Sequence, residues 1–403
     1  LDFFDAKVSS EIGALPAGPV AFAAGIEHRR ESISDRPDAL ITNGNVLGQG
    51  ATGTEGRRNN TAGYVEFSIP AVRNVELQVA GRQDKYSDFG SAFSPKVGLK
   101  WTPDKSLMVR ATASRGFRAP TLPENSRSSA TFFTSVIDTL PTSPNFNQLV
   151  NIAGSFSGNP ALKAERSRNY NAGFVWEPDR DFNIGVNWYK IRQNDVVTAN
   201  GFQTIVSNPA QFPGQILRAA DGTLVAVNDA YRNLAFTETS GVDIDLKKSF
   251  RTGWGKVTLS ADYVYVASFK SQPAQGFDIT DYVDSNGFQG GGIPRYRGRI
   301  GATLERDKWA VTLSRQENAS WDQQNVAVPP ANARVGSYVQ ADLFVSYDGL
   351  RNWRLFGSVQ NLFDTQPPFD PQNGGTATTV QYDISQNDLR GRYVTIGARY
   401  TFK

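Results

Sequence analysis

Few residues in this sequence could do acid–base or nucleophilic chemistry. Of its 403 residues none is cysteine, and His28 is the single histidine. Hydrolytic catalysis normally uses a histidine as general base, and zinc is bound mostly by Cys and His. A lone histidine in an alternating apolar segment is usually structural, and the sequence has neither a GxGxxG motif nor a P-loop. We therefore predict that the protein is not an enzyme and has no cofactor.

One acidic segment is a candidate for metal binding. DITDYVDSNG, residues 278–287, contains Asp278, Asp281, Asp284 and Asn286, whose oxygen atoms suit Ca²⁺. The segment lacks the glutamate that closes an EF-hand loop. A solvated acidic loop is the simpler interpretation, so we predict no metal site.

Two sets of residues are candidates for ligand binding. Arg295, Arg297 and Arg299 alternate in sequence, so an extended strand would place them on one face as a short basic ladder. This ladder suits an anionic ligand, and it would equally suit acidic side chains of another segment or plain solvation. The second set is aromatic and lies between predicted strands: Phe132, Phe133, Phe146, Trp321 and Phe369. Rigid rings there could hold a ligand or pack the connections against each other.

Composition excludes several classes of protein. The 42 basic and 39 acidic residues nearly balance, which argues against nucleic acid as a partner. The mean hydropathy is −0.40, and no run of about eighteen apolar residues could form a transmembrane helix. Aromatic residues make up 11% of the chain and there are 37 glycines, a combination that favours β structure with tight turns.

The elements that carry these residues are predicted to be strands with one apolar face. In GRYVTIGARYTFK, residues 391–403, Val394, Ile396 and Ala398 alternate with polar or small residues, and the same period of two recurs along the chain. We predict about fifteen strands. They cover residues 3–13, 19–32, 60–69, 74–86, 94–101, 106–116, 168–176, 182–192, 240–249, 255–267, 295–305, 308–316, 338–347, 353–361 and 390–402.

The connections between these strands alternate between short and long. The short ones include 102–106 and 177–181, and the long ones include 117–167 and 193–239. Outer-membrane barrels have this pattern, with tight periplasmic turns and extended extracellular loops. The apolar parity would then face lipid, the polar parity would face the interior, and the C-terminus would be periplasmic. Because closed bacterial barrels have an even number of strands, an odd number predicts that further strands are supplied from elsewhere.

Five motifs resemble one known family, the TonB-dependent outer-membrane receptors. ASRGFRAPTLPE (113–124) and NPALKAERSRNYNAGF (159–174) are similar to a strand-to-loop motif of the family and to the segment that enters its next strand. TSGVDIDLKKSF (239–250), VQNLFDTQPPF (359–369) and the closing strand follow in the family's order. We expect Arg118 and Glu124 of the first motif to be structural residues at the strand rim.

The resemblance implies a fold and a function. It implies an all-β, transmembrane antiparallel barrel, of which residues 1–403 would supply about the last fifteen of twenty-two strands. An N-terminal plug and the first strands would be additional, and the plug would contact TonB. The implied function is active import, across the outer membrane of a Gram-negative cell, of a scarce nutrient such as a ferric siderophore, cobalamin or saccharide. A passive porin or structural barrel is the alternative, and a soluble all-β binding protein is a third.

Overall fold

A computed structural model describes residues 1–42, 45–46, 50–272, 277–288, 291–322, 334–370, 382–383 and 386–402 of the chain. Within these residues the main feature is a 20-stranded sheet, and a separate 4-stranded sheet lies among the connections. No helix among the described residues is long and apolar enough to cross a membrane. The all-β class predicted from the alternating pattern is confirmed.

Fifteen strands of the large sheet form a continuous wall in which each strand pairs antiparallel with the next wall strand along the chain. They are β1 (Asp2–Leu15), β2 (Gly18–Asp35), β3 (Thr52–Val72), β4 (Val75–Tyr86), β5 (Gly90–Trp101), β6 (Leu107–Arg118), β9 (Glu165–Asp179), β10 (Phe182–Thr198), β13 (Arg232–Thr252), β14 (Gly255–Gln272), β18 (Tyr296–Arg306), β19 (Trp309–Asn318), β22 (Tyr338–Leu350), β23 (Trp353–Gln360) and β24 (Tyr393–Tyr400). Each predicted strand corresponds to one of them.

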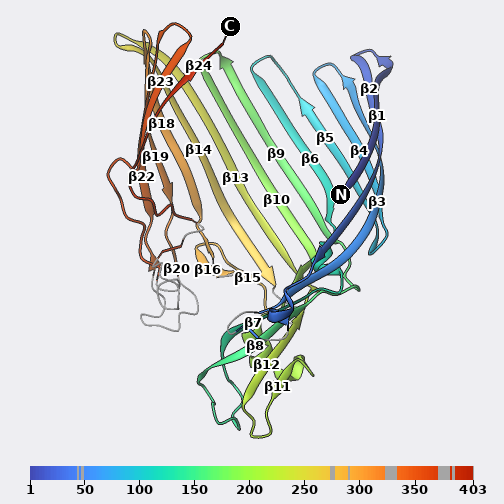
Figure 1. Ribbon diagram of the computed structural model, residues 1–403. Helices are drawn as coiled ribbons and strands as arrows, with labels where there is room; N and C mark the ends of the chain where they lie inside the picture. Colours follow the sequence, from blue (N-terminus) through green and yellow to red (C-terminus); the bar gives the residue numbers. More distant parts are fainter. Residues whose placement is uncertain are drawn as a thin grey trace.

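The short and long connections lie at opposite rims of the wall. Figure 1 shows the tight turns and the C-terminus at one rim, and the large loop structures at the other. Tight turns need residues that tolerate a left-handed backbone, and Asn74, Asp307 and Asn352 have φ of 67°, 54° and 65° at three of them. We call the two edges the short-turn rim and the loop rim.

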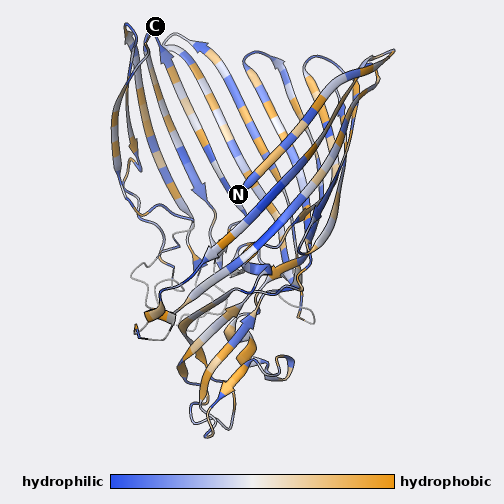
Figure 2. Cartoon of the chain, turned by 45° about the vertical axis from the view of Figure 1, so that its right-hand side comes forward, coloured by the Kyte–Doolittle hydropathy of each residue, from blue (hydrophilic) through white to orange (hydrophobic). Residues whose placement is uncertain are grey.

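The two faces of the wall differ in polarity, as the period of two requires. Figure 2 shows hydrophobic and hydrophilic residues alternating along the strands. The apolar parity is exposed and includes Val97, Leu259 and Leu313. The opposite parity carries polar side chains that bond across strands, such as Thr303 with Thr312 and Gln316 with Asp342. We call the polar side the inner face and the apolar side the outer face.

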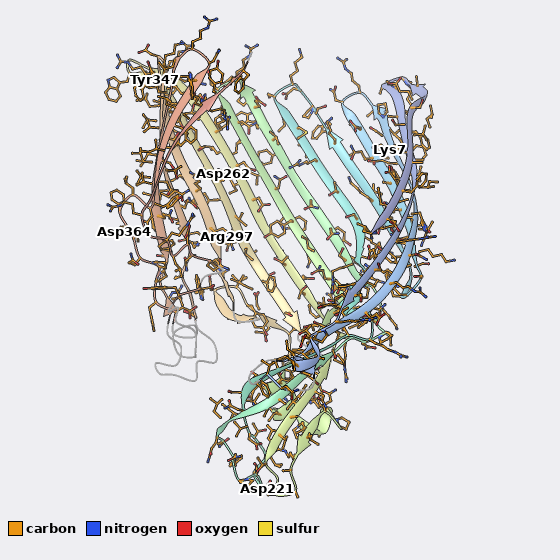
Figure 3. All side chains as sticks on the ribbon, viewed as in Figure 1. Lys7, Asp221, Asp262, Arg297, Tyr347 and Asp364 are labelled. Carbon is orange, nitrogen blue, oxygen red and sulfur yellow. The ribbon has the colours of Figure 1, made fainter. Side chains whose placement is uncertain are left out.

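Aromatic residues mark the outer face near the short-turn rim. Trp176, Trp309 and Trp353 are 43–52% exposed there. Tyr347 of β22 lies near this rim in Figure 3 and contacts the ring of Trp309. Tyr189 of β10 does not belong to this outer-face set. Its register partner in β13 is Gly241, and its parity in β10 places it on the inner face.

The connections at the loop rim contain the remaining elements: α1 (Ala39–Thr42), α2 (Leu122–Asn125), β7 (Ser129–Ile137), β8 (Leu149–Ser157), α3 (Phe202–Ser207), η1 (Pro209–Gln211), β11 (Ile216–Arg218), β12 (Leu224–Ala230), β15 (Thr280–Asp281), β16 (Ser285–Phe288), β17 (Gly291–Ile293), β20 (Trp321–Asp322) and β21 (Arg334–Val335). Residues 129–157 and 199–230 form one compact unit, which we call the loop module. In it β8 pairs with β12 in parallel, although the two strands belong to different connections.

The loop module has its own hydrophobic core. Its buried members are Val136, Ile152, Ile205, Val206, Phe212, Leu224 and Val227. The module projects beyond the loop rim, with Asp221 at its tip in Figure 3. The wall is different, because its inner face is lined by polar side chains and its outer face is open.

The wall is not closed into a barrel. Among the described residues β1 pairs only with β2, and β24 pairs only with β23. All residues of β1 are exposed. Each of these two strands therefore has one free hydrogen-bonding edge.

Candidate functional site

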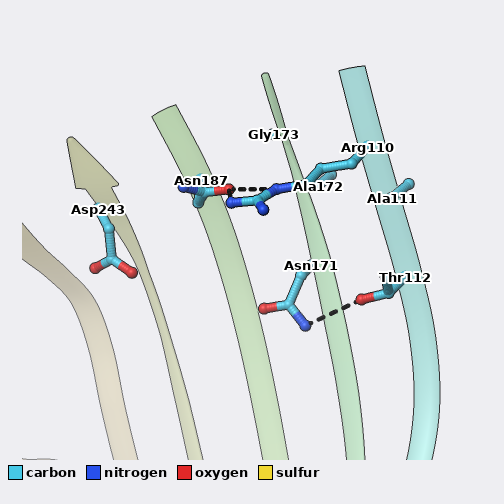
Figure 4. A pocket seen from close by; sticks show the side chains of 8 residues that line it. All are labelled: Arg110, Ala111, Thr112, Asn171, Ala172, Gly173, Asn187 and Asp243. Atoms are coloured by element: carbon cyan, nitrogen blue, oxygen red, sulfur yellow. Dashed lines mark hydrogen bonds between the residues drawn. The ribbon is translucent and has the colours of Figure 1, made fainter. Parts of the chain in front are cut away.

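The inner face has a polar hollow at the middle of the wall, which we call the inner-wall hollow. Its volume is about 370 Å³, and it is lined by Arg110, Ala111, Thr112, Asn171, Ala172, Gly173, Asn187 and Asp243. These residues come from four neighbouring strands, β6, β9, β10 and β13, as Figure 4 shows. The hollow is thus built by strand register and not by a loop.

Register explains how the side chains of the hollow meet. Arg110, Gly173, Asn187 and Asp243 form a single row across the four strands. The guanidinium of Arg110 donates to Asn187 Oδ1 from Nη2 at 2.6 Å and from Nε at 3.1 Å, passing over Gly173 (Figure 4). A Cβ at Gly173 would lie 2.6 Å from Asn187 Oδ1, so glycine keeps this path open.

The inner-wall hollow retains unused binding capacity. Arg110 is bonded to a neutral amide, and neither it nor Asp243 forms an ion pair with any described residue. One cation and one anion in the same row can therefore each accept a charged or polar group from outside the wall. Asn171, which donates to Thr112 Oγ1 at 3.3 Å, adds a further amide to the surface (Figure 4).

The basic ladder predicted at residues 295–299 is shorter in the structure. Arg297 and Arg299 lie on the inner face opposite Val264 and Asp262. Arg297 donates to Gln386 Oε1 at 3.3 Å, and Arg299 donates to Ser314 Oγ at 2.7 Å. Arg295 precedes β18, and its Nε lies 2.7 Å from Asp284 Oδ2. The structure therefore brings two of the three arginines together and pairs the third with a loop carboxylate.

The predicted aromatic residues have unequal exposure. Trp321 is 1% exposed and pairs with Val335 in the 4-stranded sheet. A Cβ at Gly292 would lie 2.4 Å from its indole ring, so Trp321 packs the connections together. Phe132 contacts the rings of Phe156 and Phe202 within the loop module.

The other three aromatic candidates are open to solvent. Phe133, Phe146 and Phe369 are 64%, 44% and 55% exposed. Of the eight candidate residues, five thus combine exposure with a position outside the loop core: Phe133, Phe146, Phe369, Arg297 and Arg299.

An ion pair stabilises the loop module from within. Arg218 Nη2 lies 2.8 Å from Asp138 Oδ1, and the Asp138 side chain is fully buried. Hydrogen bonding to Arg218 lowers the pKa of Asp138 from its ordinary 3.8 to about 2. Asp138 lies between β7 and β8 in the first connection, and Arg218 lies in β11 of the second, so the pair joins the two connections that make the module.

Arg118 and Glu124 have the structural contacts expected of them. Arg118 Nη1 lies 2.9 Å from Glu124 Oε2, and Arg118 Nη2 lies 2.5 Å from Glu165 Oε1. Glu124 also accepts from the backbone of Thr121, whose hydroxyl caps α2 in return. These contacts fix the point at which the connection leaves β6.

Two carboxylates of the acidic segment considered for calcium are in use. Asp284 accepts from Arg295, and Asp281 accepts from the backbone N–H of Phe269 and Val283. The side chain of Asn286 lies outside the described residues. Among those described, no group of three or more acidic, histidine or cysteine side chains is arranged to hold a metal ion.

Sequence reasoning did not bring Arg110 and Asp243 together with Asn187 and Asn171. Strand parity was the available signal, since it places all four on one face. Their grouping depends on which residues pair across β6, β9, β10 and β13. That register is not contained in any local pattern of the sequence.

A long antiparallel wall with an apolar outer face, a polar inner face and all long loops at one rim defines the outer-membrane class of β-barrel wall. Comparison with protein families agrees with this class. The chain belongs to the TonB dependent receptor-like, beta-barrel family, which matches residues 3–362.

Two curated relatives are similar to this chain over part of their length. An iron-regulated outer membrane virulence protein of Vibrio cholerae is 25% identical over 253 residues, which cover 63% of this chain and 33% of that protein. The heme/hemopexin utilization protein C of Haemophilus influenzae is 25% identical over 374 residues, covering 88% and 46%. The chain therefore spans less than half the length of these two relatives.

Solved structures show the same fold. The siderophore receptor PirA from Acinetobacter baumannii superposes with a TM-score of 0.69 at 16% identity, over 99% of this chain and 54% of that one. The ferric enterobactin receptor PfeA from Pseudomonas aeruginosa, in a mutant complex with enterobactin, gives 0.69 at 16% identity over 98% and 53%.

Proposed function

We propose that this chain is the wall and loop portion of an outer-membrane receptor that imports a scarce nutrient by active transport. The observation that supports it most is the polar inner face together with the family match over residues 3–362. A wall of this kind encloses a solvated or plugged interior rather than a packed core. The short-turn rim and the C-terminus would be periplasmic, and the loop rim would face outside.

The class of ligand that we propose is an iron-containing small molecule, either a ferric siderophore or haem. The support comes from the relatives, which include an iron-regulated outer-membrane protein and a haem utilization protein. Cobalamin and a saccharide are the other ligands that the resemblance of the sequence implies. On this chain, the candidate contacts are Phe133 on the loop module and Arg297 and Arg299 on the inner face.

The proposed receptor includes a plug and about seven further strands from an upstream segment. The free edges of β1 and β24 are the places at which those strands would pair. The inner-wall hollow, in which Arg110 and Asp243 form no ion pair with a described residue, would then contact the plug, and the plug would contact the TonB complex. Outer-membrane lipid would cover the apolar outer face.

Growth under iron limitation tests this function. The receptor, with its upstream segment, would be expressed in a host that lacks its own siderophore and haem receptors. Growth should be restored by at least one ferric siderophore or by haem, and restoration should require TonB. Growth that is independent of TonB would contradict active import.

The passive porin is the remaining alternative, and liposome swelling separates the two. A plugged receptor should give little swelling with small sugars, whereas an open pore gives rapid swelling. Rapid swelling by the complete receptor would favour the porin.

A further inference from the structure

The inner face carries a regular grid of polar side chains where β18, β19 and β22 approach the loop rim. Each of the three strands contributes two residues, and each residue is the register partner of one on the next strand. The two rows are Arg297, Asn318 and Tyr338, and Arg299, Gln316 and Gln340. We call these six residues the polar grid. Because alternate residues of a strand share a face, the pairing places all six on the inner side of the wall.

A small hollow lies against the amide side of the polar grid. Its volume is about 170 Å³. It is lined by Gln316, Glu317, Asn318, Tyr338, Gln340, Gln386 and Asp388. The last two belong to the connection between β23 and β24. A molecule in this hollow would therefore be held between the wall and a loop.

One carboxylate fixes the direction of both glutamine amides. Asp342 accepts from Gln316 Nε2 at 2.7 Å and from Gln340 Nε2 at 2.8 Å. It also accepts from the backbone N–H of Asn361 at 2.9 Å. Each amide thus turns its donor toward Asp342 and its carbonyl oxygen away from it. Gln316 Oε1 accepts from no described residue, so it is an acceptor of fixed direction at the surface of the grid.

The two arginines of the polar grid carry positive charge that the described residues do not balance. Arg297, which lies toward the loop rim in Figure 3, donates to Gln386 Oε1 at 3.3 Å, and Arg299 donates to Ser314 Oγ at 2.7 Å. Both acceptors are neutral. Asp262 is the register partner of Arg299 on β14, yet neither arginine forms an ion pair with it or with any other described residue. Both arginines are exposed, so each can bind a further anionic oxygen.

We propose that the polar grid binds the outer oxygens of an anionic iron chelate. The inference rests on the proposed import of an iron-containing molecule and selects among its ligands. Arg297 and Arg299 are two residues apart, about 7 Å along the strand, so they can contact two separate oxygens of one chelate. Gln316 Oε1 would accept a hydroxyl or amide N–H of the same molecule. A ferric complex of catecholates or of hydroxycarboxylates has this combination of negative oxygens and peripheral donors.

The polar grid is poorly suited to haem. Haem iron is held by histidine, cysteine, methionine or tyrosine side chains. Tyr338 is the one such residue in the grid, and it is buried, with its hydroxyl 3.3 Å from the carbonyl oxygen of Thr365. Haem also presents a wide apolar ring, which would cover the polar groups of the grid without giving them hydrogen bonds. The grid therefore fits a chelate whose own oxygens already surround the iron.

Ligand binding by the complete receptor, purified in detergent, tests the proposal. Equilibrium dialysis with radioactive iron would compare a ferric tris-catecholate, ferric citrate, a neutral ferric tris-hydroxamate and haem. At least one of the two anionic chelates should bind about tenfold more tightly than the neutral chelate and haem, and added salt should weaken its binding most.

Two results would overturn the proposal. Binding of the neutral chelate or of haem as tight as that of the anionic chelates would contradict selection by charge and would leave the import of iron standing. Binding of none of the four probes would contradict both this inference and the iron-containing ligand of the proposed function.

Variants locate the contact. Arg297→Gln together with Arg299→Gln should weaken binding of the anionic chelate about tenfold or more, and should change binding of the neutral chelate less than about twofold. Lys247→Gln is the matched control, because Lys247 is an exposed cation of the inner face near the short-turn end of β13. Equal losses in the two variants would show a general effect of charge and would contradict the assignment to the grid.

Acidic side chains of the proposed plug are the other partner for the two arginines. Loss of the arginines would then loosen the plug, and the effect would appear without any ligand. We expect liposome swelling with small sugars to be the same for the double variant and the wild type. Increased swelling with chelate affinity intact would overturn the proposal in favour of a plug contact. TonB-dependent growth, measured in parallel, reports on transport separately.

Discussion

At the scale of single residues, parity decides what an identical side chain does. Arg110 and Arg115 lie five positions apart on β6, yet Arg110 is on the inner face and bonds to Asn187, whereas Arg115 is exposed on the outer face. Two chemically identical groups therefore meet different partners because successive residues of a strand point to opposite sides. The contacts of a side chain in this wall therefore depend on its position along the strand as much as on its residue type.

Neighbouring residues Val79 and Gln78 test this rule. Val79 is on the outer face in the middle of β4, so Val79→Arg should impair assembly by roughly 2–4 kcal/mol, the cost of a cation near the bilayer midplane. Gln78→Arg is the control, because Gln78 is on the inner face and bonds to Glu76 at 3.1 Å. Heat-modifiable gel migration of membrane-extracted protein measures assembly. Equal defects in both variants would show that the two faces have been assigned wrongly.

The ion pair of the loop module gives a second residue-scale prediction. Asp138→Asn leaves the partly buried Arg218 without its counter-charge, which should destabilise the module by about 3 kcal/mol. The module should then be cleaved faster by added protease on intact cells. Asp221→Asn is the matched control, because Asp221 is an exposed acid that bonds only to Thr223 nearby.

The pH dependence of the same pair has a definite sign. The pKa of Asp138 is lowered from 3.8 to about 2, so its stabilising effect is complete above about pH 5 and is lost progressively as the pH falls toward 2. Protease resistance of the wild-type module should therefore be unchanged between pH 7 and pH 5. A loss of resistance within that range would mean that another group controls the module.

At the scale of elements, the alternating pattern predicted the strands but not their full length. β3 runs from Thr52 to Val72, whereas apolar alternation indicated only residues 60–69. The additional pairs near the loop rim, such as Arg58 with Glu31, have polar residues on both faces. Alternation disappears where a strand leaves lipid, although backbone pairing continues.

The loop module was not predicted for a related reason. Its strands β7 and β8 are short, and the pairing of β8 with β12 joins segments about seventy residues apart. A sequence pattern shows only the local alternation of apolar and polar residues. The pairing of β8 with β12 depends instead on two separate connections that come together in the folded chain. For Phe132 and Trp321 the sequence left open ligand binding and packing of the connections, and the structure shows that they pack against other parts of the connections.

Topology of the elements leads to a fourth prediction. Ala220→Cys at the tip of the loop module should react with an impermeant thiol reagent on intact cells, because the loop rim faces outside. Lys105→Cys, in the short turn between β5 and β6, should react only after the cells are opened. The chain has no cysteine of its own, so labelling has no background from it. Labelling of position 105 on intact cells would reverse the orientation.

At the scale of the whole molecule, stability has two different sources. The loop module has a small hydrophobic core, while the wall has mainly cross-strand hydrogen bonds and an apolar face that needs lipid. The wall therefore depends on its surroundings in a way that the module does not. The inner face also depends on its surroundings, because the inner-wall hollow and the arginines of β18 are polar. These side chains would contact water or the proposed plug inside the barrel.

The final prediction concerns closure of the wall. β1 and β24 each have a free edge, and every unpaired backbone group in hydrocarbon costs several kcal/mol. Residues 1–403 expressed alone should thus fail to give a heat-modifiable species, and co-expression of the upstream segment, on the same or a separate polypeptide, should restore it. A double cysteine variant, with one residue in β24 and one in the first upstream strand, should then form a disulfide across the seam. A stable closed barrel formed by residues 1–403 alone would contradict this prediction, because β1 and β24 would then have to pair with each other. That result would favour the porin.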